Sequence, residues 1–272
     1  MNRIYENPLY KFLRKTFYQV LDALTKRRGV RVKVNGFSLR LPAHYYRMFP
    51  SDYEQDNFHF FKKVARRGMT CIDIGAHVGL YSVFMSKYGE GKVFAFEPTI
   101  SSREILQKVV ELNRCQQSIT VVPAAVSEKN GKATFFVANA PLSMANSLVD
   151  IQFGDGDLWR SGYDVEVVSI DSFVEKKDLK VDFLKIDAEG VEVEVLKGAK
   201  DTFIKHRPSG TLGIHPFAYK NMLATMTEIW HLLETYNMEV FFDGKTITKE
   251  NFLMKSEIFD VQFIPRGARV PE

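Results

Sequence analysis

Two short segments carry residue types suited to binding an adenosine-containing cofactor. In the first, CIDIGAHVG at residues 71–79, an acidic, glycine-spaced loop joins an apolar run to a helical pattern, and Glu97 ends the next expected strand. A tight structural turn would explain Gly75 and Gly79, but not Asp73 or Glu97. The spacing differs from the G-x-G-x-x-G of dinucleotide sites. Asp73 favours a cationic ligand, because a carboxylate repels pyrophosphate. The pattern therefore indicates S-adenosylmethionine, which carries an ammonium and a sulfonium.

The second segment, FLKIDAEGVE at residues 183–192, brings Asp187 and Glu189 to a turn after an apolar strand. Helix capping would account for only one of these two carboxylates. Ligands of open α/β sheets bind beyond the carboxyl ends of the strands. We therefore expect one site to collect the strand-end residues Asp73, Glu97, Pro123, Ala124, Ala125, Asp187 and His215.

Strand and helix patterns alternate from residue 52 onward, which predicts a parallel sheet covered on both faces. The expected strands are 69–74, 92–97, 119–122, 181–186, 212–214, 239–242 and 258–264. Expected helices between them are 58–67, 80–87, 101–114, 191–196 and 222–236. Further strands are expected at 132–137 and 165–168, beside an irregular segment at 138–164. A long loop in a compact domain is usually functional, so this segment is an expected lid.

The motifs DIGAHVGLYS, VFAFEP and LKIDAEGVEVEVLKGA together resemble the FkbM family of S-adenosylmethionine-dependent methyltransferases, over roughly Ser51 to Asp243. The resemblance implies a Rossmann-like class I methyltransferase fold with a mostly parallel, seven-stranded sheet. It also implies O-methylation, since family members commonly modify hydroxyl groups of sugars and natural products. We therefore expect a sugar or glycan acceptor. Small-metabolite N- or carboxyl-methylation and a non-catalytic scaffold of the same fold are the alternatives.

The same resemblance assigns residues to the cofactor and the acceptor. The cofactor set is Tyr53, Glu54, Asp73, Gly75, Ala76, His77, Gly79, Glu97, Pro98, Ala124, Ala125 and Asp187. The expected acceptor set is Asn146, Ser147, Trp159, Glu189 and His215. Two positions depart from the family pattern: His77 stands where many members have Asn, and His215 where many have an acid.

Transfer to an alcohol needs a group that takes the hydroxyl proton, and Asp187 and His215 are the expected catalytic residues. An imidazole titrates near neutral pH without help, which favours His215 as the base. A divalent cation is the competing device. Asp187, Glu189 and His215 offer oxygen and nitrogen ligands that could hold Mg²⁺ or Mn²⁺ and lower the pKa of a bound hydroxyl.

The basic residues of the chain are concentrated near its N-terminus. Residues 1–31 contain eight Lys or Arg against two acids, although the whole chain has a net charge of +4. Apolar residues recur at helical spacing over 9–24, and Asn35-Gly36 marks a two-residue hairpin turn within 30–41. We expect an N-terminal extension at 1–50 and a methyltransferase domain at 51–272. The basic helix could pack on that domain, form a dimer contact or lie on a membrane.

Other function classes fit the sequence less well. The basic charge lies in the N-terminal arm, and no base-reading motif is present, so no nucleic-acid partner is expected. Two cysteines support neither a disulfide framework nor a cysteine zinc site. With no long apolar run and no secretory leader, a cytoplasmic protein, at most associated with a membrane surface, is the expectation.

Overall fold

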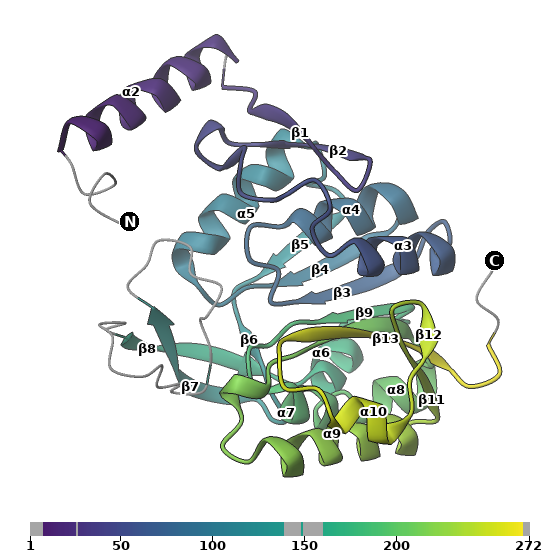
Figure 1. Cartoon of the computed structure of the whole chain (residues 1–272). Helices are drawn as coiled ribbons and strands as arrows, with labels where there is room; N and C mark the ends of the chain where they lie inside the picture. The colour runs from purple at the N-terminus through teal and green to yellow at the C-terminus, as the bar shows by residue number, and fades with distance from the viewer. Residues whose placement is uncertain (1–7, 26, 139–147, 149–159, 269–272) are drawn as a thin grey trace.

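The computed structural model describes residues 8–25, 27–138, 148 and 160–268, and its centre is a twisted sheet with helices on both faces (Figure 1). The main sheet has the strand order β12-β11-β13-β10-β9-β3-β4-β5. In that order the strands are Lys245–Thr246, Met238–Phe242, Phe259–Pro265, Ser209–Ile214, Phe183–Ile186, Thr70–Ile74, Lys92–Phe96 and Ile119–Val122. Neighbours from β10 to β5 pair in parallel, whereas β13 is antiparallel to both β10 and β11.

This topology confirms the Rossmann-like α/β fold class. The described sheet has eight strands instead of the expected seven, because the chain turns back after β11 and forms the short strand β12. Phe241 and Phe242 pair there with Thr246 and Lys245. β12 lies at the edge of the sheet, so it leaves the order of the other seven strands unchanged.

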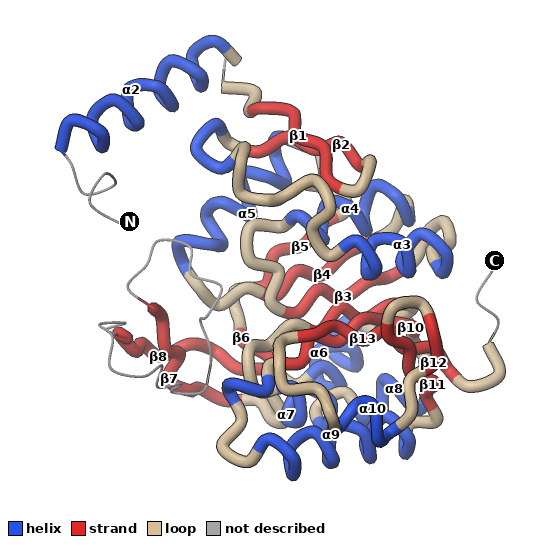
Figure 2. The backbone as a smooth tube through the Cα atoms, in the orientation of Figure 1, coloured by secondary structure: helices blue, strands red, loops and turns tan. Residues whose placement is uncertain are grey.

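Helices cover the two faces of the sheet separately (Figure 2). One face carries α3 (Gln55–Val64), α4 (Leu80–Gly89) and α5 (Ile100–Leu112). The other carries α6 (Ile170–Lys177), α7 (Glu192–Lys197), α8 (Lys200–His206), α9 (Met222–Thr235) and α10 (Lys249–Leu253). Two short 3₁₀ helices, η1 (Ala43–Tyr45) and η2 (Pro216–Ala218), join neighbouring elements. Since both faces are covered, β3, β4 and β9 read as nearly continuous apolar runs.

A second, three-stranded sheet follows β5. It has the order β6-β8-β7, with β6 at Ala125–Val126, β7 at Gly131–Ala138 and β8 at Arg160–Val168. Residues 160–164, expected in an irregular segment, therefore belong to a strand that pairs with β7. The other residues of the expected lid lie outside the described chain, except for Ala138 and Leu148.

The N-terminal residues form a helix and a hairpin. α2 spans Pro8–Leu24, and β1 (Val30–Val34) pairs with β2 (Phe37–Leu41). Asn35 and Gly36 have φ angles of 47° and 78°, as a hairpin turn of mirror-image type requires. The hairpin packs its buried side chains against the α4 side of the core, whereas α2 extends away from the body (Figure 1). In the described part of the chain, no helix combines the length and apolarity that a membrane span requires.

Candidate active site

A cavity lies at the carboxyl ends of the parallel strands, where the expected site residues should meet. It encloses about 910 Å³, including the part of its mouth that is open to solvent. Expected site residues that line it are Tyr53, Glu54, Gly75, Ala76, His77, Glu97, Pro98, Ala124, Ala125, Asp187 and Glu189. Asp73, Gly79 and His215 lie behind this lining. Asn146, Ser147 and Trp159 lie outside the described residues, so their expected roles stay predictions.

The end of strand β3 places a buried carboxylate, Asp73, against the start of α4. Asp73 is fully buried, and its Oδ2 accepts a hydrogen bond of 2.5 Å from Ser82 Oγ. Its Oδ1 has no hydrogen-bond partner among the described residues. Gly75 has a φ angle of 75°, and a Cβ atom there would lie 2.0 Å from the carbonyl oxygen of Asp187. Glycine is therefore needed where the two motif loops meet.

Glu97 directly follows β4, and backbone N–H groups fix its carboxylate. Oε2 accepts from the N–H of His77, and Oε1 accepts from the N–H of Thr99, both at 2.8 Å. Burial raises the pKa of Glu97 to about 7, although these two N–H groups and Arg103 favour the ionised form. Each oxygen keeps a lone pair, so the carboxylate can still accept from ribose hydroxyls.

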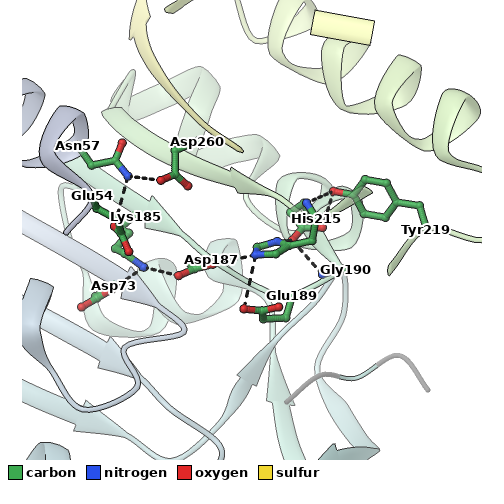
Figure 3. A network of polar contacts seen from close by, with 11 residues as sticks. Glu54, Asn57, Asp73, Lys185, Asp187, Glu189, Gly190, His215, Tyr219 and Asp260 are labelled. Carbon is green, nitrogen blue, oxygen red and sulfur yellow. Dashed lines mark hydrogen bonds and ion pairs between the residues drawn. The ribbon is translucent and has the colours of Figure 1, made fainter. Parts of the chain in front are cut away.

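Lys185 is a buried cation that joins the two motifs, a role that was not expected from the sequence. Its Nζ lies 3.0 Å from Asp187 Oδ2 and 4.0 Å from Asp73 Oδ1 (Figure 3). Burial opposes its charge, but Asp187, Asp73 and Glu54 hold the pKa of the ammonium well above its usual value. A lysine inside the otherwise apolar strand FLKI was the sequence signal for this role.

Asp187, Glu189 and His215 converge at one end of the cavity (Figure 3). His215 Nε2 lies 3.4 Å from Asp187 Oδ1 and 3.5 Å from Glu189 Oε1. Burial raises the pKa of Glu189 to about 8, despite the opposing charge of His215. Burial also favours the neutral form of Asp187, but Lys185 and His215 hold its pKa below the usual value. Asp187 is therefore ionised at neutral pH.

The buried carboxylate of Glu192 holds the second ring nitrogen of His215, Nδ1. Glu192 Oε1 lies 2.8 Å from His215 Nδ1 and accepts the N–H of Gly190 at 2.9 Å, while Oε2 accepts from Tyr219 OH at 2.8 Å. Burial alone would lower the pKa of His215, but Glu192, Glu189 and Asp187 raise it to about 9. His215 thus carries a proton at neutral pH in this arrangement. The expectation that it titrates near neutrality without help is corrected, because three carboxylates surround it.

A second acidic group borders the cavity on the α3 side. Asn57 Nδ2 donates to Asp260 Oδ2 at 2.8 Å and to Glu54 Oε2 at 3.3 Å, and its Oδ1 accepts from Gln262 Nε2 at 2.8 Å. Burial and the charge of Glu54 raise the pKa of Asp260 to about 7. Asp260 and Asn57 were absent from the expected site.

These residues fit a cationic adenosine cofactor. Asp73 Oδ1 accepts no hydrogen bond from the described residues and has only Lys185 Nζ at 4.0 Å, so it can accept from a charged donor near the β3 loop. Glu97 offers acceptors for a ribose. The apolar residues Phe96, Ala124, Ala125, Val126 and Leu148 line the part of the cavity suited to an adenine ring.

Comparison with known proteins supports the same interpretation. The model of the methyltransferase FkbM domain matches residues 73–240, which is more than half of the chain. The chain belongs to the FkbM methyltransferase family.

Two curated methyltransferases are similar to part of this chain. Methyltransferase sdnD of Sordaria araneosa is 26% identical over 155 residues, which cover 48% of this chain and 60% of the relative. Methyltransferase 1 of Beauveria bassiana (strain ARSEF 2860) is 25% identical over 146 residues, covering 48% and 58%. The chain therefore spans less than two thirds of the length of either relative.

Solved structures with a similar backbone include methyltransferase FkbM of Methylobacillus flagellatus KT. It has a TM-score of 0.47 and 17% sequence identity, and the match covers 78% of this chain and 51% of that one. SMU.1697c of Streptococcus mutans, solved in complex with SAH, has a TM-score of 0.46 and 9% identity, and the match covers 79% of this chain and 99% of that one.

The match to the FkbM domain model begins at Asp73 and ends in β11, so α2, the hairpin and α3 lie outside it.

Proposed function

We propose that this chain is an S-adenosylmethionine-dependent O-methyltransferase whose acceptor is a hydroxyl group of a sugar or glycan. One observation carries the proposal: the ribose-type carboxylate of Glu97 and the polar cluster around Asp187 border the same cavity. Membership of a methyltransferase family supports the reaction class. The sugar acceptor rests on the family resemblance and on the hydrogen-bond acceptors at the Asp187 end.

The cofactor would lie across the carboxyl ends of β3 and β4. Asp73 and the backbone at Gly75 would face its methionine end, Glu97 its ribose and Ala124–Ala125 its adenine. When bound, S-adenosylmethionine would supply an electrophilic methyl group on its sulfonium. The residues of the chain then act mainly by orientation, because aligned reactants avoid much of the entropic cost of the transition state.

Asp187 and Glu189 would bind and orient the acceptor hydroxyl. Both line the cavity, and Asp187 is the ionised acceptor that can take the hydroxyl hydrogen bond. Protonated His215 attracts both side chains electrostatically, because its Nε2 lies 3.4 Å from Asp187 Oδ1 and 3.5 Å from Glu189 Oε1. As the bond between the acceptor oxygen and the methyl carbon forms and the sulfur–carbon bond breaks, the hydroxyl proton would pass to the Asp187 carboxylate. General-base catalysis of this kind contributes about 10²- to 10⁴-fold in rate.

An amine acceptor is the second candidate, because acidic side chains dominate the polar lining. Glu54, Asp187 and Glu189 face the cavity, with Asp260 behind Glu54 and one ammonium, Lys185, among them. An amine bound there could donate hydrogen bonds to these oxygens, and its charge would favour their ionised forms. A screen that offers amino sugars beside neutral sugars separates the two candidates, since the methylated atom identifies the acceptor group.

Glu97→Ala is the test of the cofactor site. We expect the dissociation constant of S-adenosylhomocysteine, measured by isothermal titration calorimetry, to rise about 100-fold, because hydrogen bonds to charged groups contribute about 1.5–3 kcal/mol each. Glu90→Ala is the matched control, because Glu90 is exposed and pairs with Arg67. Unchanged binding in Glu97→Ala, or no binding to well-folded wild type, would contradict the proposal.

The same site predicts a pH dependence. Ribose hydroxyls favour the ionised form of Glu97, whose pKa in the free protein is about 7. Affinity for S-adenosylhomocysteine should therefore fall as the pH drops from about 8 to about 6. Other groups near Glu97 are His77, Arg103 and Tyr163. Comparing wild type with Glu97→Gln isolates the contribution of Glu97, and identical pH profiles would refute it.

A further inference from the structure

Three potential ligand atoms at the acceptor end of the cavity have the spacing of a metal site. Asp187, Glu189 and His215 each offer one atom, and the three atoms lie within 4.8 Å of one another. The 3.4 Å and 3.5 Å separations from His215 Nε2 exceed the usual 2.7–3.2 Å of an N–H···O hydrogen bond. They are close to the separation of neighbouring ligands on an ion with bonds of about 2.1 Å, which lie about 3.0–3.4 Å apart.

The surroundings hold the imidazole in the orientation that a metal ligand needs. Glu192 binds Nδ1 and is itself held by the Gly190 N–H and Tyr219 OH, so Nε2 faces Asp187 and Glu189. Metal-ligating histidines commonly use the second ring nitrogen in this way. Glu192 is fully buried, so no solvent competes for this contact.

The carboxylates of Asp187 and Glu189 also line the cavity and face His215 Nε2. Lys185 engages Asp187 Oδ2, which leaves Oδ1 on the His215 side. Glu189 has a φ angle of 51°, a left-handed conformation that is costly for a glutamate and that turns its side chain toward His215. Because both acids line the cavity, an ion there would keep coordination positions open to an acceptor.

We propose that Asp187, Glu189 and His215 form a divalent-cation site that binds two neighbouring oxygens of the acceptor, as a vicinal diol would supply. The cation takes the place of the proton that His215 Nε2 carries in the ion-free protein. The ligand set of two carboxylates and one imidazole suits Mn²⁺ and related ions better than an all-oxygen site would. The diol part of this inference rests on the proposed function, whereas ion binding does not.

Mn²⁺ binding to the full-length, cofactor-free protein tests the site, with electron paramagnetic resonance reporting free and bound ion. We expect one site per chain, with affinity lowered at least about tenfold in His215→Ala, Glu189→Gln and, through orientation of the ligand, Glu192→Gln. Asp201→Asn is the control, because Asp201 is exposed and pairs with Lys205. S-adenosylhomocysteine binding to each variant shows that the fold is intact.

The outcomes separate the two proposals. Folded wild type that binds S-adenosylhomocysteine but not Mn²⁺ would overturn the metal site and leave the methyltransferase function standing. Mn²⁺ binding that survives His215→Ala unchanged would overturn the assigned ligands. For the diol, we expect stronger Mn²⁺ relaxation of a vicinal-diol acceptor than of its monodeoxy analogue, and equal relaxation would overturn chelation.

A second, independent observation concerns α2. The described side chains of Leu9, Phe12, Leu13, Phe17, Val20 and Leu24 are between 51% and 76% exposed. Helical spacing places them along one broad face. The helix contacts the body near η1, where Tyr18 packs on His44 with ring centroids 4.2 Å apart. The apolar face is therefore directed away from the core.

The basic residues in and after α2 indicate which partner covers its apolar face. α2 contains Lys11, Arg14 and Lys15 against Asp22, and Arg27, Arg28 and Arg31 follow it. Two such helices would repel each other across a dimer contact, whereas an anionic surface complements them. We infer that α2 lies in the surface of a membrane containing anionic lipids. Basic amphipathic helices bind such surfaces through buried apolar area and electrostatic attraction.

Sedimentation of the full chain with vesicles tests this surface. We expect binding to phosphatidylcholine vesicles with about 30 mol% phosphatidylserine, weakened by added salt. Leu13→Gln/Phe17→Gln should lower binding at least about tenfold, because both exposed apolar side chains lose their burial in the membrane surface. Met254→Gln is the control, because Met254 is 81% exposed on another element. Equal binding to pure phosphatidylcholine, or an α2-dependent dimer by light scattering, would overturn the inference.

Discussion

Asp187→Asn should lower the rate of methyl transfer about 10³-fold and change the affinity for S-adenosylhomocysteine much less. The substitution keeps the size of the side chain but removes the negative charge that faces His215 Nε2 at 3.4 Å and Lys185 Nζ at 3.0 Å. An amide at this position is a weak acceptor for a hydroxyl proton. The measurement is kcat and KM with an acceptor identified in the sugar and amino-sugar screen.

The control for Asp187→Asn has to separate chemistry from folding. Asp201→Asn changes an exposed acid far from the cavity and should leave both kcat and KM unchanged. Unfolding followed by circular dichroism shows whether the Asp187 variant keeps its structure. A folded variant with kcat within about threefold of wild type would exclude general-base or ligand chemistry at Asp187, because such roles contribute far more.

The strand-end rule predicted much of the site because most strands of the sheet are parallel. Asp73, Glu97 and Asp187 follow or end neighbouring strands, and the structure brings them to one edge as expected. The strand-end rule did not predict Asp260 as a site residue. β13 is antiparallel to β10, so its beginning, not its end, lies at the cavity edge. Orientation within a sheet depends on tertiary pairing, which the apolar pattern of a single strand does not report.

The groups that orient the acids of the site could not be predicted from the sequence. They are Lys185, Glu192 and Tyr219. Lys185 and Glu192 lie inside the recognised motif, but each also needs a partner that is remote in the chain, Asp73 for Lys185 and His215 for Glu192. Glu192 meets His215, 23 residues away, and Asn57 meets Asp260, 203 residues away. Because residue type and local spacing carry no information on such contacts, the sequence predicted the ligand-facing acids better than the groups that orient them.

The N-terminal hairpin was predictable for a local reason. Asn35-Gly36 supplies the two positive φ angles of the turn, and alternating apolar residues fix which face is buried. For α2, spacing predicted a helix but not its direction relative to the core. The exposed fractions of its apolar side chains were needed to show that they face away.

Lys185→Met should lower the free energy of unfolding by about 3–5 kcal/mol at pH 8, because removing one partner of a buried ion pair leaves uncompensated charge. Asp73 is fully buried and Asp187 depends on Lys185 to stay ionised. Methionine has a similar length, so the variant tests charge more than packing. Urea unfolding followed by circular dichroism measures the change.

The pH dependence of this loss identifies its cause. Without Lys185, the pKa values of Asp73 and Asp187 in the folded variant should lie above those in the unfolded chain. The folded variant then binds protons more tightly, so its stability should recover as the pH falls from about 8 to about 5. Lys197→Met is the matched control. Its partner Glu228 lies 2.6 Å away, but both side chains are over a third exposed, so we expect a loss of at most about 1 kcal/mol. A Lys185→Met loss that is equally small, or independent of pH, would show that the buried carboxylates do not need this ammonium.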